Sequence, residues 1–321
     1  MVGVNVLIFC ARRLFLFFSS LVASSAIVFT LLRLLPGDLA QAKLGIQATP
    51  ESLALLRHQM GLDRSLFSQY LDWLIHAIHG DLGISILSGA DVTSEIMQKA
   101  TVTIPLIIMA SILAVLISIP LGMYAALRYR NFDGVATSGF SQLGIAVPIF
   151  WSGILIAATF AILWPLLPAG GFPESGWSNP GPALKSMILP VFTLALGQGA
   201  VLMRFARSAT IDTLQQDYFR TARATGLTRF QALRIHGVRN ALIPVISVLG
   251  MQIATLVVEA IIVENVFALP GIGQMLLQDV NNRDLLKVQG IIAVTTSIVF
   301  LVGFMVDIAL GLLDPRVRQT R

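Results

Sequence analysis

Six long stretches of this sequence carry no charged side chain, and they limit its fold more than any other feature. Each holds between 18 and 33 residues, and a helix crosses a bilayer with about 20 mostly apolar residues. One such helix can be buried in a soluble protein, but six of them separated by charged segments require a membrane. The sequence therefore predicts an all-α, polytopic membrane protein with six transmembrane helices. The six stretches are Leu14–Leu32, Thr101–Leu127, Val135–Leu167, Ser186–Met203, Ala241–Val258 and Val288–Val306.

Two of these stretches need a separate interpretation. The first follows Arg12 and Arg13, as the apolar core of a signal peptide does, but it is longer than the roughly 7–15 apolar residues of such a core. We therefore expect an uncleaved first span. The third is longer than a straight span requires, so it predicts a tilt, a kink at Pro148 or a portion that lies in the membrane interface.

The composition excludes several classes of protein. Hydrophobic residues make up 55% of the chain and charged residues 12%, about half the charged share of a soluble domain. An ordinary soluble enzyme and a disordered chain are both excluded. The single cysteine, Cys10, excludes an intrachain disulfide framework and a cysteine-based zinc cluster. The net charge of +5 would suggest a nucleic-acid partner for a soluble protein, but here we expect a lipid bilayer and no nucleic acid.

The basic residues predict the orientation of the spans. If the N-terminus lies inside, the inside segments carry 14 Lys and Arg residues and the outside segments carry 8. Cytoplasmic loops are the ones enriched in Lys and Arg, and six spans return the chain to its starting side. We therefore expect both the N-terminus and the C-terminus in the cytoplasm.

These spans divide the chain into three parts. We expect a cytoplasmic N-terminus and first span over residues 1–35, an external segment over 36–100, and a core with five spans over 101–321. Thr49 and Pro50 predict a helix start in the external segment, with Thr49 as the N-cap. Apolar residues at helical spacing follow, and they predict two or three amphipathic helices at the outer membrane face: Leu53, Leu56, Met60, Leu66, Tyr70, Trp73 and Leu74. The Gly- and Pro-rich connection Pro168–Pro182 predicts a loop.

The inside segment 204–240 is the one most suggestive of function. A helix is expected over Asp212–Ala224, a turn at Gly226, which tolerates positive φ, and a second helix from Arg229 to about Asn240, capped by Thr228. This predicts a helix–turn–helix elbow that projects from the membrane. Two interpretations remain open from composition: its small and basic residues dock a partner protein, or its arginines follow the topology rule and bind anionic headgroups. The small and basic residues are Arg220, Ala222, Arg223 and Ala224.

The elbow resembles a loop found in a known family. The run Asp217-Tyr218-x-Arg220-Thr221-Ala222-Arg223-Ala224-x-Gly226-Leu227, followed by Arg239-Asn240-Ala241-Leu242-Ile243-Pro244, is similar to the "EAA" loop of ABC importer permeases. Where the general pattern has Glu-Ala-Ala before the glycine, this chain has Arg220-Thr221-Ala222, as in the dipeptide, oligopeptide and nickel subfamily.

Further motifs extend the resemblance over nearly the whole chain, to the first ("B-type") permease subunit of that subfamily. They are Leu35-Pro36-Gly37-Asp38, Gly61-Leu62-Asp63, Gly80-Asp81-Leu82-Gly83, Pro148-x-Phe150-Trp151, Glu264-x-Val266-Phe267-x-x-Pro270-Gly271-Ile272-Gly273, Arg283-Asp284 and Asp314-Pro315-Arg316. The chain departs from the family pattern at Glu259, where a Gly is usual. It also departs at Thr101, Pro105 and Leu310, where the family more often has Pro, Glu and Tyr.

The resemblance implies a type I ABC importer permease fold in the inner or plasma membrane of a prokaryotic cell. The implied partners are a homologous second permease, two ABC ATPase subunits that bind ATP and Mg, an external solute-binding protein and a peptide substrate. This chain has no G-x-x-x-x-G-K-[ST] phosphate loop, so we expect it to be no enzyme and to hold no metal or cofactor. The residues implied to couple to the ATPase are Asp217, Arg220, Thr221, Ala222, Arg223, Ala224, Gly226 and Leu227.

Alternatives remain for the substrate and the pathway. The same machinery could import nickel, glutathione or another small solute, and a stand-alone secondary transporter is a further alternative. Glu259 is either a pathway carboxylate that meets a cationic group or, as we expect, an interfacial acid near the outer end of the fifth span. We expect Phe267 to pack into the bundle rather than gate it, and Asp307 to pair with an inside arginine. The pathway or outer-gate candidates are Glu259, Glu264, Phe267, Pro270 and Gly271.

Overall fold

The computed structural model describes residues 2–34, 39–44, 48–59 and 61–313, and these are helical apart from their connections and one isolated β-bridge between Ile84 and Asp91. Three features of the sequence fall outside the described residues: Met60, the motif Leu35-Pro36-Gly37-Asp38 and the motif Asp314-Pro315-Arg316. The side chain of Leu310 is also outside them.

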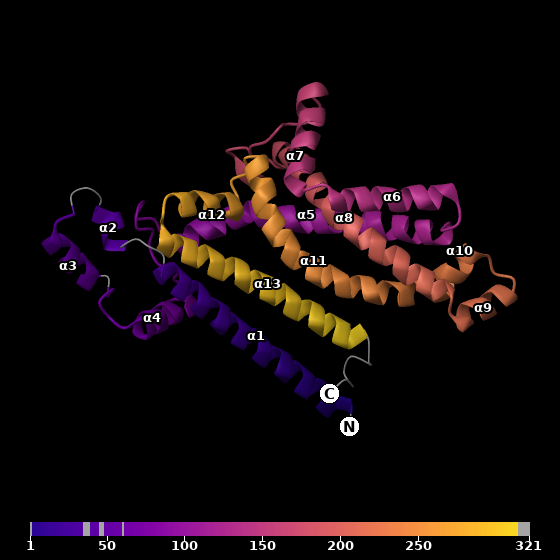
Figure 1. Cartoon of the computed structure of the whole chain (residues 1–321), viewed down its shortest axis with the longest axis horizontal. Coiled ribbons are helices and arrows are strands. Elements are labelled where there is room, and N and C mark those ends of the chain that lie inside the picture. The colour runs from indigo at the N-terminus through magenta and orange to yellow at the C-terminus, as the bar shows by residue number, and fades with distance from the viewer. Residues whose placement is uncertain (1, 35–38, 45–47, 60, 314–321) are drawn as a thin grey trace. The chain divides into compact units, whose positions relative to one another are not determined.

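The helices follow one another along the chain, with longer connections over residues 79–91 and 164–179 (Figure 1). They are α1 (Val2–Leu34), α2 (Leu39–Leu44), α3 (Pro50–Gln59), α4 (Leu66–Ile78), α5 (Val92–Leu127), α6 (Phe132–Ala146), α7 (Ile149–Ala157), α8 (Pro180–Leu214), α9 (Asp217–Ala224), α10 (Arg229–Ala232), α11 (Val238–Val266), α12 (Ile272–Asn281) and α13 (Leu285–Leu313). Two π-helical turns, Ala158–Leu163 and Leu233–Gly237, extend α7 and join α10 to α11.

In the described part of the chain, five helical segments are long and apolar enough to cross a membrane, and there are six if a bent pair of helices is counted as one span. The bent pair, Phe132–Ala146 and Ile149–Leu163, turns by 104°. Pro148 causes the break because it lacks a backbone N–H and forces Val147 into an extended conformation with ψ 123°. Of the three alternatives for this stretch, a tilt, a kink at Pro148 or an interfacial portion, the structure shows the kink. The other five are Cys10–Leu34, Val92–Leu127, Pro180–Leu214, Arg229–Val266 and Leu285–Ile308.

The chain forms two compact units that interleave along the sequence. Unit 1 consists of Met1–Arg13, Thr103–Leu269 and Leu301–Arg321, and unit 2 consists of Leu14–Val102 and Pro270–Phe300. The segment between the first and second spans thus shares a unit with most of the first span and with α12.

Close helix packing holds unit 1 together. Apolar residues of α5, α8 and α11, several of them alanines, form a buried cluster there, which includes Ala114, Leu202 and Val245. Gly122 of α5 lies so close to α8 that an added Cβ would stand 2.7 Å from the Met203 carbonyl oxygen. Small residues that let backbones approach are the usual basis of helix association in a membrane.

Unit 2 has its own apolar core, formed by the start of α5 with α12 and α13. Val92, Ile96, Ile272 and Ile291 are each at most 2% exposed there. The amphipathic helix α4 packs against α1 through Tyr70, whose hydroxyl bonds Ser25 Oγ at 2.9 Å. The expected external helices are present as α2, α3 and α4, and Thr49 caps α3 through Ser52 N at 3.2 Å.

Helix boundaries around the elbow differ from the expected ones. The helix expected over Asp212–Ala224 is interrupted at Gln215 and Gln216, so α8 runs on from the membrane to Leu214 and α9 starts at Asp217. The second helix does not end near Asn240, because no breaker occurs there. It continues through the π turn into the span of α11.

Candidate functional site

The elbow is a bent pair of short helices, α9 and α10, at the C-terminal end of α8 (Figure 1). Gly226 has φ +94° and an added Cβ would meet nothing within 4 Å, so the turn needs glycine for its backbone and not for space. Thr228 caps α10 in a capping box: its hydroxyl accepts from Gln231 N at 3.2 Å, and Gln231 Oε1 accepts from Thr228 N at 2.9 Å. The predicted turn and cap are both confirmed.

A small apolar core makes the elbow stiff. Phe219, Ala222, Ala232 and Leu233 are all at most 8% exposed and pack together. Met123 and Leu127, at the end of α5, pack against the same cluster. The elbow is therefore fixed to a membrane-spanning helix of unit 1 by side-chain packing as well as by its own chain connections.

The outer surface of the elbow carries exposed basic side chains and a few exposed apolar ones. The side chains of Arg220 and Asp217 are 74% and 98% exposed and stand 3.4 Å apart. Arg223 Nη1 donates to the Leu227 carbonyl at 2.6 Å across the turn. Phe230 and Ile235 are 64% and 61% exposed; sequence reasoning missed both, although Phe230 stands out as an aromatic residue among polar neighbours.

Of the eight predicted coupling residues, most lie on this surface. Ala222 points into the elbow core at 8% exposure, and Leu227 is half-buried against it. These two contribute to the shape of the elbow from within. The six exposed members are Asp217, Arg220, Thr221, Arg223, Ala224 and Gly226.

The structure places the candidates from the end of α11 in packed surroundings. Glu264 is 0% exposed, and Thr103 Oγ1 donates to its Oε1 at 2.5 Å. Phe267 is also 0% exposed and lies beside Gly153, whose added Cβ would stand 3.3 Å from the Phe267 ring. Phe267 is thus packed within unit 1 in this structure. Pro270 and Gly271 precede α12 in unit 2, with Gly271 as its N-cap.

Glu259 is hydrogen-bonded to a side chain of α8. Gln198 Nε2 donates to Glu259 Oε2 at 2.9 Å, and Gln252 Nε2 donates to Gln198 Oε1 at 2.9 Å. Since Gln198 lies near the middle of α8, Glu259 is level with the middle of that helix. Sequence reasoning missed both glutamines, although Gln252 and Glu259 are polar, seven residues apart and hence on one face of α11.

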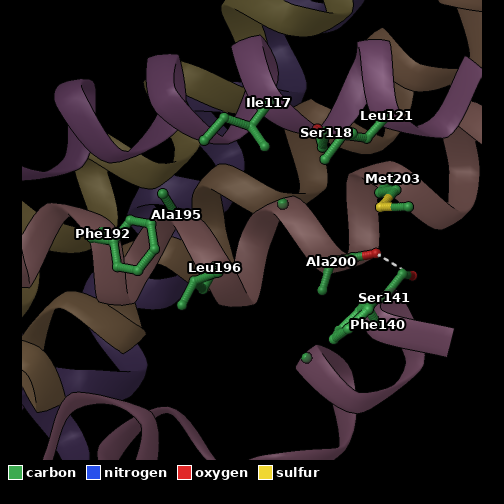
Figure 2. A pocket seen from close by; sticks show the side chains of 12 residues that line it. Ile117, Ser118, Leu121, Phe140, Ser141, Phe192, Ala195, Leu196, Ala200 and Met203 are labelled. Atoms are coloured by element: carbon green, nitrogen blue, oxygen red, sulfur yellow. Dashed lines mark hydrogen bonds between the residues drawn. The ribbon is translucent and has the colours of Figure 1, made fainter. Parts of the chain in front are cut away.

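An apolar cavity of about 170 Å³ lies on the opposite face of α8. Figure 2 shows Leu196 and Ala200 of α8 facing it, with Ile117 of α5 and Phe140 of α6 also lining it. Its polar side chains are two serines, and Ser141 already donates to the Ala200 carbonyl at 3.0 Å. This lining offers no charged group to a ligand, so the cavity is a poor site for a peptide.

Unit 2 contains a group of ionisable side chains that sequence reasoning missed. Lys287 Nζ lies 2.5 Å from Glu95 Oε2 and 3.3 Å from Asp279 Oδ2. Asp284 is 1% exposed and accepts from Ser85 Oγ at 2.5 Å. Burial raises the pKa of the Asp279 carboxyl, and the opposing effect of Lys287 is smaller. These contacts join α5, α12 and α13.

Two further points concern charge. Arg13 pairs with Asp307, which confirms the expected inside partner for that acid. Among the described residues, no three His, Cys, Asp or Glu side chains are grouped to hold a metal ion.

Comparison with known families gives two matches that together cover most of the sequence. Residues 118–319 match the profile described as "Binding-protein-dependent transport system inner membrane component", and residues 6–109 match its N-terminal counterpart. The elbow and the Gln198–Glu259 contact both lie within the first match.

Similar proteins cover nearly the full length of this chain. A "Dipeptide transport system permease protein DppB" of Escherichia coli (strain K12) is 33% identical over 98% of this chain and 99% of its own. A "Di/tripeptide transport system permease protein DppB" of Pseudomonas aeruginosa (strain UCBPP-PA14) is 34% identical over 98% and 99%. A "Putative peptide permease protein" of Brucella ovis is 34% identical over 97% and 99%.

One solved structure resembles the fold. The crystal structure of "an amino acid ABC transporter with histidines" matches with a TM-score of 0.50 and 18% identity, over 70% of this chain and 94% of that one. At this identity the likeness concerns the fold alone, and it agrees with an all-α membrane permease.

Proposed function

The chain belongs to the family of binding-protein-dependent transport system inner membrane components, and from that membership we propose that it is a permease subunit of an ATP-driven importer of peptides. It is a multi-pass membrane protein of a transporter, and its family is not itself catalytic. The observation that carries the proposal is the elbow α9–α10, which combines a stiff apolar core with an exposed basic tip.

The elbow has the properties that a mechanical link requires. Its buried core fixes it to the end of α5, and α8 and α11 lead from it into the membrane. A partner that grips the tip can therefore move two spans without first unfolding the link. We propose that the partner is an ABC ATPase subunit, whose ATP-driven closure moves this elbow and that of a homologous second permease. Arg220 and Phe230 would supply a charge and an apolar anchor for such contact.

Peptides are the proposed substrates because the similar proteins are named as peptide permeases, and this chain matches them over nearly their full length. An external solute-binding protein would deliver the peptide, and the external helices α2–α4 would dock it. ATP and Mg would be bound by the ATPase subunits. The basic elbow is proposed to face the cytoplasm together with both termini, in accord with the distribution of Lys and Arg. Import of nickel, glutathione or another small solute by the same machinery is the alternative.

The elbow is tested by Gly226→Trp in the assembled transporter. A bulky side chain at the tip should block the ATPase contact, so we expect the ATPase subunits to be lost on purification and peptide uptake to fall at least about tenfold. Gly89→Trp is the matched control, because Gly89 also has positive φ and open space within 4 Å. It should leave ATPase binding unchanged.

Normal co-purification and normal uptake by Gly226→Trp would refute the elbow as the ATPase contact. Peptide uptake by the purified chain alone, driven by a proton or sodium gradient and without ATPase subunits, would instead favour a stand-alone secondary transporter.

A further inference from the structure

Three polar side chains form a ladder between the membrane-spanning helices α8 and α11. The order is Gln252, Gln198 and Glu259, joined by the two 2.9 Å hydrogen bonds already described. Gln198 is 2% exposed, and glycines stand on both sides of it in the sequence. Because glycine has no side chain, α8 can pack closely against the adjacent helices at this point. The Gln198 amide is held between its two hydrogen-bond partners, Glu259 and Gln252.

The direction of the hydrogen bonds is the one that an ionised carboxylate requires. A carboxylate accepts hydrogen bonds only, so Gln198 must turn its NH₂ group toward Glu259. Its oxygen then faces Gln252, which donates. Both amides are thus oriented by Glu259, and Gln198 acts as a positioning residue for the carboxylate.

Glu259 differs from Asp307, Glu95 and Asp279 in having no cation beside it. Asp307 pairs with Arg13, while Glu95 and Asp279 share Lys287. For Glu259 the described residues supply one amide donor and no ion pair. A charge at membrane depth is costly and normally meets a partner or faces an aqueous path, and a carboxylate offers about four acceptor positions. The arrangement leaves room for a cation from outside the chain.

The carboxylate can be approached along an exposed side of α11. Met251 and Val258 are 67% and 60% exposed, and Thr255, one turn before Glu259, is exposed as well. The ladder runs along the edge of this exposed strip. A ligand moving along the strip would meet Thr255 and Glu259 without entering between the helices.

We propose that Glu259, positioned by Gln198, binds the positively charged group of a substrate during its passage, so that the importer favours cationic peptides over neutral peptides of equal size. The identity of the substrate as a peptide rests on the proposed function. The preference of the site for positive charge does not.

The first experiment compares uptake of alanyl-lysine and alanyl-norleucine by the complete transporter in cells without other peptide importers. Both peptides carry the N-terminal ammonium, and they differ in the ε-ammonium of the lysine side chain. In Glu259→Gln, which keeps the side-chain size, we expect the ratio of lysine to norleucine peptide uptake to fall about tenfold. The ratio is independent of the amount of transporter in the membrane, and comparing it between the variant and the wild type cancels the preference of the binding protein.

Three variants control this result. Glu174→Gln removes an exposed acid from the connection before α8 and should leave the ratio unchanged. Glu259→Asp keeps the charge and should restore most of the ratio. Gln198→Leu removes the donor and should lower the ratio by a smaller factor than Glu259→Gln. An equal fall for both peptides in Glu259→Gln, or no change in either, overturns the proposal.

The second experiment does not depend on peptide uptake. In a Cys10→Ser background, Thr255→Cys places a thiol one turn from Glu259, and its rates of modification by a cationic and an anionic methanethiosulfonate reagent are compared in membranes. We expect the cationic reagent to react faster, and Glu259→Gln to remove this preference. Equal rates with Glu259 present, or no reaction with either reagent, overturn the site. A preference found here together with no peptide uptake by the wild type would refute the peptide substrate alone.

Discussion

The elbow and the ionic cluster around Lys287 use the same residue types in opposite ways. In the elbow the charged side chains are outside, with Arg220 at 74% exposure, and an apolar core of Phe219 and Leu233 holds the helices. In unit 2 the charges are inside, with the Lys287 side chain at 11% and that of Asp279 at 9% exposure. Exposed charged side chains remain available to a partner protein, whereas the buried ones are paired with one another and join the helices of their own unit. Burial, and not residue type, separates the two roles.

The largest effect is expected from Phe219→Ala, which empties the elbow core. Truncating a buried phenylalanine costs about 4 kcal/mol, more than a short two-helix elbow can absorb. We expect the elbow to become sensitive to trypsin at its arginines and peptide uptake to be lost. Phe230→Ala, at an exposed position, should leave trypsin resistance intact while weakening ATPase co-purification. Equal trypsin sensitivity in the two variants would contradict an independently packed elbow.

Lys287→Met should come next, because it leaves two acids without their shared cation. Breaking a buried ion pair from one side costs about 3 kcal/mol, so we expect a clearly lower unfolding temperature for the detergent-solubilised transporter. Lys287→Arg keeps the charge and should lower the unfolding temperature much less. If the Met and Arg variants unfold at the same temperature, the cluster does not stabilise unit 2.

Asp279→Asn should have a smaller effect that depends on pH. Because the pKa of Asp279 is raised in the folded protein, its folded form binds a proton more readily than its unfolded form. This group therefore stabilises the fold more as the pH falls from above the folded pKa toward the ordinary aspartate pKa. As the pH falls through that interval, the unfolding temperature of the wild type should rise relative to that of Asp279→Asn. The exposed control Glu174→Gln should show no such trend. A difference that is independent of pH would argue against the raised pKa.

The smallest effect on stability is expected from Arg220→Ala. Its ion pair with Asp217 is exposed and 3.4 Å long, and such pairs contribute little. The unfolding temperature should stay unchanged, while ATPase co-purification falls about threefold because a charge-assisted contact is lost. A stability loss comparable with that of Phe219→Ala would place Arg220 among the structural residues and remove the contrast with the elbow core.

The intramembrane ladder combines features of both regions. Gln198 is buried as Asp279 is, but Glu259 is only half-buried and has no cation beside it in the described chain. By the reasoning that separates the elbow from the ionic cluster, a partly accessible carboxylate without an internal cation is available to an external one. The uptake-ratio experiment on Glu259→Gln tests that extension directly.

Local features of the chain were predictable because their causes lie within a few residues. Long uncharged stretches require helices in a membrane, Gly226 permits a positive φ, and Thr228 with Gln231 makes a capping box. The break at Pro148 was also predictable, since proline lacks the donor that a helix needs. The likeness of the elbow motif to a permease family was likewise readable from the sequence, and family comparison confirms it.

The remaining features depend on which distant residues meet. The 104° angle between α6 and α7, the inward position of Ala222, the Gln252–Gln198–Glu259 ladder and the shared Lys287 were not visible in the sequence. The partners in these contacts are up to almost two hundred residues apart (Glu95 and Lys287). By itself the sequence determined where the helices form, because helix formation depends on local composition and on the membrane. Only the tertiary structure decided which polar groups are paired inside the protein, because a hydrogen bond or ion pair forms only where packing brings both partners within about 3 Å.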